Sequence, residues 1–280
     1  QLIKASPNLA NYITRTPSSQ QTIDFANPSA VKALNAALLK HHYRVTDWNI
    51  PDGALCPPVP GRVDYIHYTA DLLDSVEPDK SVRMLDIGTG TTGIYPLLAS
   101  SVYDWECVAT DISKASLDNV AKVLKSNAAL KSRISLRLQH DKHKMFEGVV
   151  LPQEQFDISV CNPPFHASAE DALRGSQRKV ANLNKGKAEP KSEPLLNFGG
   201  MENELWCNGG EALFLKKMIK ESKQFASQIH WFTSLVSKAE NLKPLSKLAN
   251  KAGATDVKII EMTQGKKQTR ILAWTFQAIG

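Results

Sequence analysis

Apolar residues follow two different periods along residues 81–280. Short, nearly continuous apolar runs are typical of strands buried in a sheet, whereas apolar positions three and four residues apart indicate helices. The runs that predict strands lie at 81–88, 134–138, 156–161 and 229–236, and near 256–261 and 271–277. The helical patterns lie at 112–127 and 210–226, and near 241–252. Strands that alternate with helices in this way predict an α/β fold, with a mostly parallel sheet and helices on both faces.

Two regions interrupt this alternation. Residues 1–80 carry helical patterns near 28–42 and 63–76, separated by a proline-rich stretch. We predict that they form a helical extension packed on the core, and that 81–280 is the main domain. The second interruption, 167–209, has a basic middle part and is longer than the connections usual inside a compact domain. We therefore expect a functional or mobile segment there.

Composition narrows the class of protein. Hydrophobic residues make up 42% and charged residues 22% of the 280 positions, which suits a folded globular chain. A formal net charge of +6 permits a polyanionic partner. The four cysteines form no CxxC pair, so we expect reduced thiols in the cytoplasm and no metal site. No apolar run approaches the roughly 18 residues of a membrane span. The chain begins with Gln1, and we expect that its natural start is missing.

The stretch LDIGTGTTG (85–93) follows a predicted strand and precedes a helix. Glycines such as Gly88 and Gly90 let the backbone turn tightly and approach a ligand closely. Asp111 ends the next strand, where a doubly wound sheet places a carboxylate against ribose hydroxyls. Asp86 would repel a cofactor phosphate but could hold a cationic amino group, which favours S-adenosyl-L-methionine over a dinucleotide. For the glycines alone, a structural strand–helix turn is the alternative.

A second motif, CNPPFH (161–166), follows directly on the apolar run at 156–161. Proline has no backbone donor, so Pro163 and Pro164 end the pairing of that strand. The side-chain oxygen of Asn162 and the carbonyl of Pro163 could accept the two hydrogens of a planar exocyclic amine, and Phe165 could stack on its ring. Such positioning would aim the nitrogen lone pair at a methyl group without a strong base. The alternative is a strand-ending turn with a core phenylalanine.

Together these motifs resemble class I S-adenosylmethionine-dependent amino-methyltransferases, and three longer stretches narrow the resemblance. They are similar to the bacterial 23S ribosomal RNA adenine N6-methyltransferases of the RlmF type. The stretches are DFANPSAVKALNAALL (24–39), PPVPGRVDYIHYTADLL (57–73), and NFGGMENELWCNGGEALFLKKMI (197–219) with WFTSLVSKAENL (231–242). The resemblance implies a Rossmann-like seven-stranded sheet with its last strand antiparallel. It also implies S-adenosyl-L-methionine as cofactor and one adenine of 23S ribosomal RNA as substrate.

The resemblance assigns two more cofactor contacts. Arg62 follows the proline-rich stretch, and its counterpart in related enzymes contacts the methionine carboxylate. A guanidinium suits that task because it can form a bidentate, charge-assisted pair with a carboxylate. Gln139 follows the strand at 134–138, where this fold commonly contacts the adenine ring of the cofactor. Both residues are therefore expected at the cofactor site.

The long connection supplies the expected RNA contacts. Arg174, Arg178 and Lys179 belong to its basic part, and we expect them to neutralise RNA phosphates as a clamp. Trp206 either stacks on an RNA base or anchors the connection to the core. The expected partner is 23S ribosomal RNA or an assembly intermediate of the large subunit. We expect the enzyme to be a monomer.

Three other functions share most of these motifs. Guanine N2-methyltransferases of ribosomal RNA and protein glutamine methyltransferases also present a planar amine to such acceptors, and a non-catalytic RNA-binding protein could keep the fold. The basic segment favours RNA over protein, and the resemblance over the whole chain favours adenine over guanine. A non-catalytic module is disfavoured because the expected site residues are intact, namely Asp86, Gly88, Asp111 and Asn162. Cofactor binding measured by calorimetry would separate that last class from the enzymes.

Overall fold

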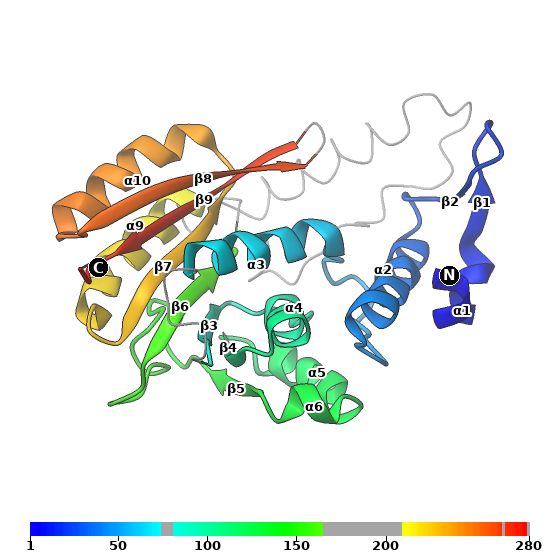
Figure 1. Cartoon of the computed structure of the whole chain (residues 1–280), viewed down its shortest axis with the longest axis horizontal. Coiled ribbons are helices and arrows are strands. Elements are labelled where there is room, and N and C mark those ends of the chain that lie inside the picture. The colour runs from blue at the N-terminus through cyan, green and yellow to red at the C-terminus, as the bar shows by residue number, and fades with distance from the viewer. Residues whose placement is uncertain (74–80, 165–208, 265–266, 279–280) are drawn as a thin grey trace.

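The computed structural model describes residues 1–73, 81–164, 209–264 and 267–278. These residues contain a seven-stranded sheet in the order β5-β4-β3-β6-β7-β9-β8 (Figure 1). Its strands are β3 (Arg83–Ile87), β4 (Glu106–Asp111), β5 (Ile134–Leu138), β6 (Phe156–Cys161), β7 (Ile229–Val236), β8 (Asp256–Gln264) and β9 (Lys267–Thr275). The strand β9 runs antiparallel to both of its neighbours, and all the other pairs are parallel. The predicted fold class is confirmed.

Two hydrophobic cores separate the helices into layers on either face of the sheet. Successive residues of a strand point to opposite faces, and Met84 and Leu85 accordingly belong to different cores. The first core joins the sheet to α2 (Pro28–Tyr43), α3 (Val59–Leu73), α4 (Ile94–Tyr103), α5 (Lys114–Lys125) and α6 (Ala128–Lys131). The second core joins it to α9 (Gly210–Ser222) and α10 (Ala239–Ala252), and a 3-10 turn, η2 (Lys223–Phe225), follows α9 (Figure 1).

The first part of the chain holds elements that the apolar pattern did not predict. They are α1 (Leu2–Ala5), the 3-10 helix η1 (Pro7–Tyr12) and a hairpin of β1 (Ile13–Arg15) with β2 (Gln21–Ile23). A small core of their own, which includes Leu9 and Ile23, fastens them to α2. Three-residue strands and a four-residue helix are too short to show a period, which explains why the pattern missed them.

The helix α3 begins at Val59, four residues before the predicted start. Pro60 occupies its first turn, where the missing backbone donor costs nothing and the fixed φ suits a helix. Arg62 therefore lies on a helix rather than on a turn. One hydrophobic core contains Trp48 and Tyr65 together with Met84, so residues on both sides of position 80 pack together. The domain boundary expected at residue 80 therefore stays a prediction.

The described residues contain neither a candidate membrane span nor a candidate metal cluster. None of the helices in these ranges is long and apolar enough to cross a membrane. No group of three or more histidine, cysteine, aspartate or glutamate side chains within them has the arrangement of a metal site.

Candidate active site

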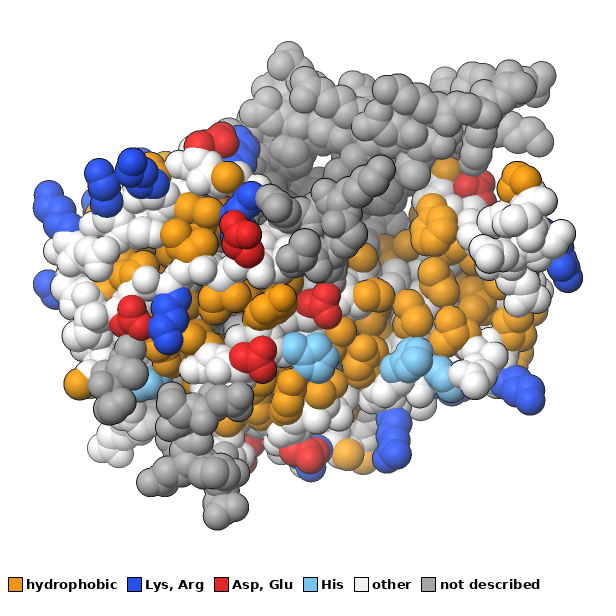
Figure 2. Space-filling model, turned by 45° about the horizontal axis from the view of Figure 1, so that its top comes forward, with side chains coloured by type: hydrophobic (Ala, Val, Ile, Leu, Met, Phe, Trp, Pro, Cys, Tyr) orange, Lys and Arg blue, Asp and Glu red, His pale blue; other side chains and the backbone are white. Residues whose placement is uncertain are grey.

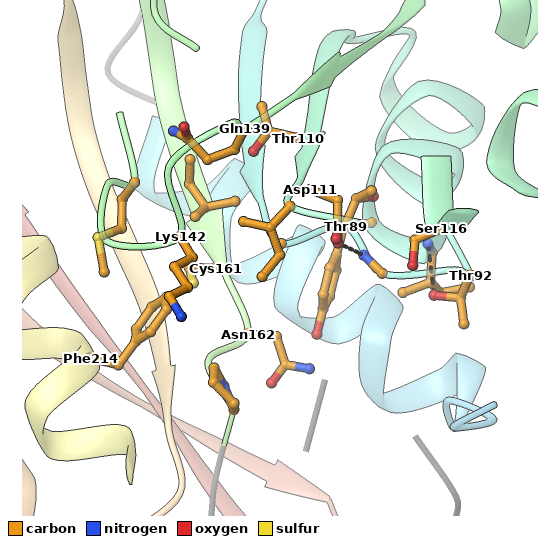
Figure 3. A pocket seen from close by; sticks show the side chains of 18 of the residues that line it. Thr89, Thr92, Thr110, Asp111, Ser116, Gln139, Lys142, Cys161, Asn162 and Phe214 are labelled. Carbon is orange, nitrogen blue, oxygen red and sulfur yellow. Dashed lines mark hydrogen bonds between the residues drawn. The ribbon is translucent and has the colours of Figure 1, made fainter. Parts of the chain in front are cut away.

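A cavity of about 490 Å³ opens at the carboxyl ends of β3, β4 and β6. Ligands bind in this crevice in open α/β sheets. Its lining combines the glycine turn after β3, the end of β4, the loop after β5, the end of β6 and one side of α9. Figure 3 shows Asp111 and Asn162 in this cavity, with Lys142 and Phe214 on another side of it.

The glycine turn is the first part of the wall. Gly88, Gly90 and Gly93 have φ values of 73°, 65° and 56°, in the left-handed region that glycine enters without strain. At Gly93 a side chain would also meet Val120 of α5, since a Cβ there would lie 2.8 Å from the Val120 Cγ1. The third glycine of the motif therefore permits close packing of α5. The turn itself is fixed by the Thr89 amide, which donates to the Thr110 carbonyl at 2.8 Å.

Asp111 ties the end of β4 to this turn. Its carboxylate accepts from the backbone amide of Gly90 at 2.8 Å and from that of Ser113 at 2.7 Å. Burial raises the pKa of Asp111, and these amide donors oppose the rise. The Ile112 amide also lowers this pKa, and because an ionised carboxylate has about four acceptor sites, capacity remains for a hydroxyl donor of a ligand. Asp111 lines the cavity as the sequence predicted for a ribose contact, and that contact stays a prediction.

Asp86 is fully buried, and neither of its carboxylate oxygens has a hydrogen-bond partner among the described residues. Burial raises its pKa to about 7, the nearby Thr89 hydroxyl opposes this rise without standing in hydrogen-bond geometry, and the Asp111 carboxylate adds to it. A buried, unpaired carboxylate is costly. A buried carboxylate of this kind indicates a place where a cationic hydrogen-bond donor of a ligand binds.

Arg62 lines the cavity and places a cation there, whereas Asp86 is not among the lining residues and lies buried next to the lining residue Ile87. Its Nη1 donates to the Tyr95 hydroxyl at 2.8 Å, and its guanidinium lies 5.7 Å from the centre of that ring. The site thus offers a guanidinium and a carboxylate with spare acceptors in the wall of the cavity, and the unpaired carboxylate of Asp86 behind that wall. This set fits S-adenosyl-L-methionine, whose amino-acid head carries both charges and whose ribose carries hydroxyl donors.

The N-terminal part of the chain supports the glycine turn, which the sequence did not reveal. The indole nitrogen of Trp48, a buried residue, donates to the Thr92 carbonyl at 3.0 Å. The Asn119 side chain donates to the carbonyls of Thr91 and Asn49, at 2.8 and 2.9 Å. The segment before α3 and the turn after β3 are therefore held as one unit.

The loop after β5 is the opposite wall. Gln139 uses both ends of its amide to shape this loop, donating to the Glu147 carbonyl at 2.8 Å and accepting from the Asp141 amide at 2.9 Å. Glu221 of α9 accepts the backbone amides of Met145, Phe146 and Glu147, each at 2.9 Å. Gln139 lines the cavity as expected. Its polar atoms are occupied, so its first role is to hold the loop, and contact with an adenine ring stays a prediction.

Asn162 stands directly after the last paired residue of β6. Its Oδ1 is buried and has no hydrogen-bond partner among the described residues, although the residue lines the cavity. Pro164 also lines the cavity, and Pro163 is buried beside it. The structure thus places an unused amide acceptor where the sequence predicted one.

Tyr65 of α3 holds the strand end that carries Asn162. It is fully buried, and its hydroxyl accepts from the Cys161 amide at 3.3 Å. The same hydroxyl lies 2.8 Å from the Thr233 hydroxyl, which itself donates to the Ser159 carbonyl. Sequence reasoning missed this residue, because a tyrosine in a helical pattern indicates only a core position.

Several predicted site residues lie outside the described residues. They are Phe165 of the second motif and the expected RNA contacts Arg174, Arg178, Lys179 and Trp206. The basic clamp at 167–209 lies outside them too, apart from Gly209 at its end. These roles stay predictions.

The sequence of this chain matches a known protein family. The model of a family described as RNA methyltransferase matches residues 1–278. Two curated proteins, each named Ribosomal RNA large subunit methyltransferase F, are similar at 56% identity. The one from Saccharophagus degradans aligns over 97% of this chain and 89% of its own length, and one from Shewanella baltica over 99% and 77%.

Solved structures agree with the fold. The catalytic domain of human METTL16 in complex with MAT2A 3′UTR hairpin 1 matches 99% of this chain and 90% of its own, with a TM-score of 0.81 and 27% identity. The N-terminal domain of the same protein, in complex with SAH, matches 99% and 93%, with a TM-score of 0.78 and 24% identity. The second likeness carries information on the fold alone.

Proposed function

Since this chain belongs to the RNA methyltransferase family, we propose that it methylates N6 of one adenine in 23S ribosomal RNA. The methyl donor is S-adenosyl-L-methionine. The names of the curated relatives support a large-subunit ribosomal RNA as substrate. The adenine amine is supported by the motif around Asn162 and by the resemblance of the whole chain to adenine N6-methyltransferases.

The donor is bound through three charged side chains. Arg62 pairs with its carboxylate, Asp86 takes up its ammonium group directly or through water, and Asp111 accepts from the ribose hydroxyls. When bound, the donor supplies an electrophilic methyl group on a sulfonium. The orphan carboxylate of Asp86 supports this arrangement, because an ammonium ion removes the penalty of burying an unpaired charge.

The single observation that carries the reaction is the Oδ1 of Asn162, which is buried without a hydrogen-bond partner among the described residues. The amine of adenine is planar, because its lone pair is delocalised into the ring. Asn162 accepts one amine hydrogen and the carbonyl of Pro163 accepts the other, so the nitrogen becomes more tetrahedral and its lone pair turns toward the methyl group. Phe165 stacks on the base. Acceptors fixed before the reaction stabilise the charge that develops on nitrogen, and the methylated nitrogen then loses its proton to water.

Preorganisation comes from the residues behind Asn162. The Tyr65 hydroxyl holds the backbone of Cys161 and is itself held by Thr233, so the amide of Asn162 starts from a fixed strand end. Catalysis by positioning is sensitive to small displacements of the reacting groups. The enzyme therefore depends on α3 for its geometry as well as for Arg62.

The substrate form and the setting are part of the proposal. We infer a protein that acts as a monomer in the cytoplasm on 23S ribosomal RNA or on an assembly intermediate of the large subunit. A comparison of methylation rates on protein-free RNA and on isolated large-subunit particles, at equal RNA concentration, distinguishes the two substrates.

Substitution of Asn162 tests the reaction. Asn162→Ala should lower the rate of methylation by about 100-fold or more, the usual cost of losing one preorganised donor or acceptor. Affinity for the demethylated cofactor should stay close to that of the parent. The assay is methyl incorporation into transcribed 23S ribosomal RNA, with the modified base identified by mass spectrometry.

The matched control is Asn250→Ala, which removes an exposed amide from α10. It should leave the rate unchanged. If Asn162→Ala methylates RNA at nearly the parental rate, Asn162 has no role in the reaction. If the product contains N2-methylguanine, the target base is guanine and not adenine.

A further inference from the structure

The segment from α9 to α10 carries a strong excess of exposed positive charge. Within residues 210–252, the exposed lysines outnumber the one exposed acid, Glu240. These lysines are Lys216, Lys217, Lys220, Lys223, Lys238, Lys243, Lys247 and Lys251. In Figure 2, blue side chains gather on the left of the view, at the end of the molecule where α10 lies in Figure 1. We call these eight residues the lysine surface.

The two other acids of this segment do not screen the lysine surface. Glu221 is buried and receives three backbone amides of the loop after β5. Glu211 is also buried and accepts from the amides of Ser237 and Lys238 and from the Asn241 side chain. None of the eight lysines forms an ion pair with another described residue. Both carboxylates are thus used for folding, and the surface keeps its positive charge.

Helical spacing aligns the lysines on the outer side of both helices. On α10, Lys243, Lys247 and Lys251 follow each other at intervals of four, and on α9, Lys216 and Lys220 are four apart, so each set shares one side of its helix. Lys223 follows directly after α9, in η2. The inner side of α10 packs Leu242, Leu245 and Ala249 into the core, and α9 packs Leu215 and Met218 there. The contacts of Glu211 pin the start of α9 to the start of α10.

The lysine surface reaches the candidate active site. Lys217 and Phe214 of α9 line the cavity that also contains Asn162. The helix α10 follows directly after β7, at the active-site edge of the sheet, and the contacts of Glu211 place the start of α9 at the same edge. Positive charge therefore continues from the mouth of the cavity along the outside of the molecule.

We propose that the lysine surface of α9 and α10 binds phosphates of the ribosomal RNA that flanks the target adenine. This inference rests on the proposed function, since it needs an RNA whose base enters the cavity. Lysine ammonium groups are flexible point charges, which suits contacts that position a backbone without reading its sequence. A membrane surface is a poorer occupant, because the apolar side of α10 is buried in the core.

The experiment compares two triple variants that remove the same charge from opposite faces of the sheet. The test variant is Lys220→Ala, Lys243→Ala, Lys247→Ala, which avoids Lys217 at the cavity. The control variant is Lys122→Ala, Lys125→Ala, Lys131→Ala, on α5 and α6, where these lysines are also exposed. Binding of transcribed 23S ribosomal RNA is measured between about 50 and 200 mM salt, the range over which phosphate contacts strongly change affinity.

In the test variant the dissociation constant for RNA should rise about tenfold or more, and the slope of log affinity against log salt should flatten by about 2–3, since each lost phosphate contact contributes 0.7–0.9. The control should keep the parent's slope. Affinity for the demethylated cofactor and the rate at saturating RNA should stay unchanged in both.

Two outcomes separate this inference from the proposed function. If the parent methylates 23S ribosomal RNA but both triple variants bind it with the same affinity and slope, the lysine surface is only a solvated face and the inference fails alone. If the parent methylates no ribosomal RNA, the proposed function fails, and the inference fails with it.

Discussion

The buried carboxyl of Asp86 predicts that cofactor binding depends on pH near neutrality. Its pKa is raised from the ordinary 3.8 to about 7, chiefly by burial and further by Asp111. The ammonium group of the donor needs the ionised carboxylate. Below pH 7 the free protein must therefore release a proton from Asp86 before it binds, and the apparent dissociation constant should rise about tenfold for each pH unit, which is about 1.4 kcal/mol.

The same shift has the opposite sign for the stability of the free protein. Because the folded pKa lies above the ordinary value, the folded chain holds more protons than the unfolded chain between pH 3.8 and about 7. The contribution of Asp86 to stability is complete below that window and is lost as pH rises through it. Cofactor binding should reverse this loss, so the stabilisation by the cofactor should be larger at pH 7 than at pH 5.5.

Titration calorimetry with the demethylated cofactor, from pH 5.5 to 7, checks this reasoning. The range stays below the ordinary pKa of an amino group, roughly 7.7–8.0, so the ligand keeps its charge. Asp86→Asn should bind weakly and lose the steep dependence, whereas Asp118→Asn, an exposed control on α5, should keep it. A parent that binds equally at pH 6 and pH 7, or a variant with the parent's profile, would refute the role of Asp86.

Two further predictions concern neighbouring residues. Asp111→Ala should weaken cofactor binding by about 1–3 kcal/mol, the range for a lost hydrogen bond to a charged group plus the donors it leaves unpaired; unchanged affinity by calorimetry would remove Asp111 from the site. Tyr65→Phe removes the hydroxyl that holds Cys161 and should lower kcat, by about tenfold, with little change in KM for the cofactor. The control Tyr68→Phe should keep kcat, and a Tyr65→Phe enzyme with parental kcat would show that the hydroxyl has no positioning role.

Much of this site was predictable from short stretches of sequence. Gly88 and Gly90 follow an apolar run, and Pro163 and Pro164 end another, so local backbone chemistry alone places both motifs at strand ends. Parallel strands bring their carboxyl ends to one edge, which is why Asp86, Asp111 and Asn162 could be expected together. Asp86 likewise indicated a cationic group on the ligand, whereas the role of Arg62 followed from the resemblance to related enzymes.

The tertiary structure alone decided which residues hold these motifs in place. Tyr65 and Cys161 are 96 positions apart, Trp48 and Thr92 are 44 apart, and Glu221 reaches a loop more than 70 positions away. The tertiary structure also directs the Gln139 side chain to the loop after β5. It leaves the outer lysines of α9 and α10 without ion pairs among the described residues. A repeating apolar pattern reports which side of an element is buried, because burial acts on every residue of that side. The partner of a single hydroxyl, indole or carboxylate depends on how distant elements pack, and no local pattern records that.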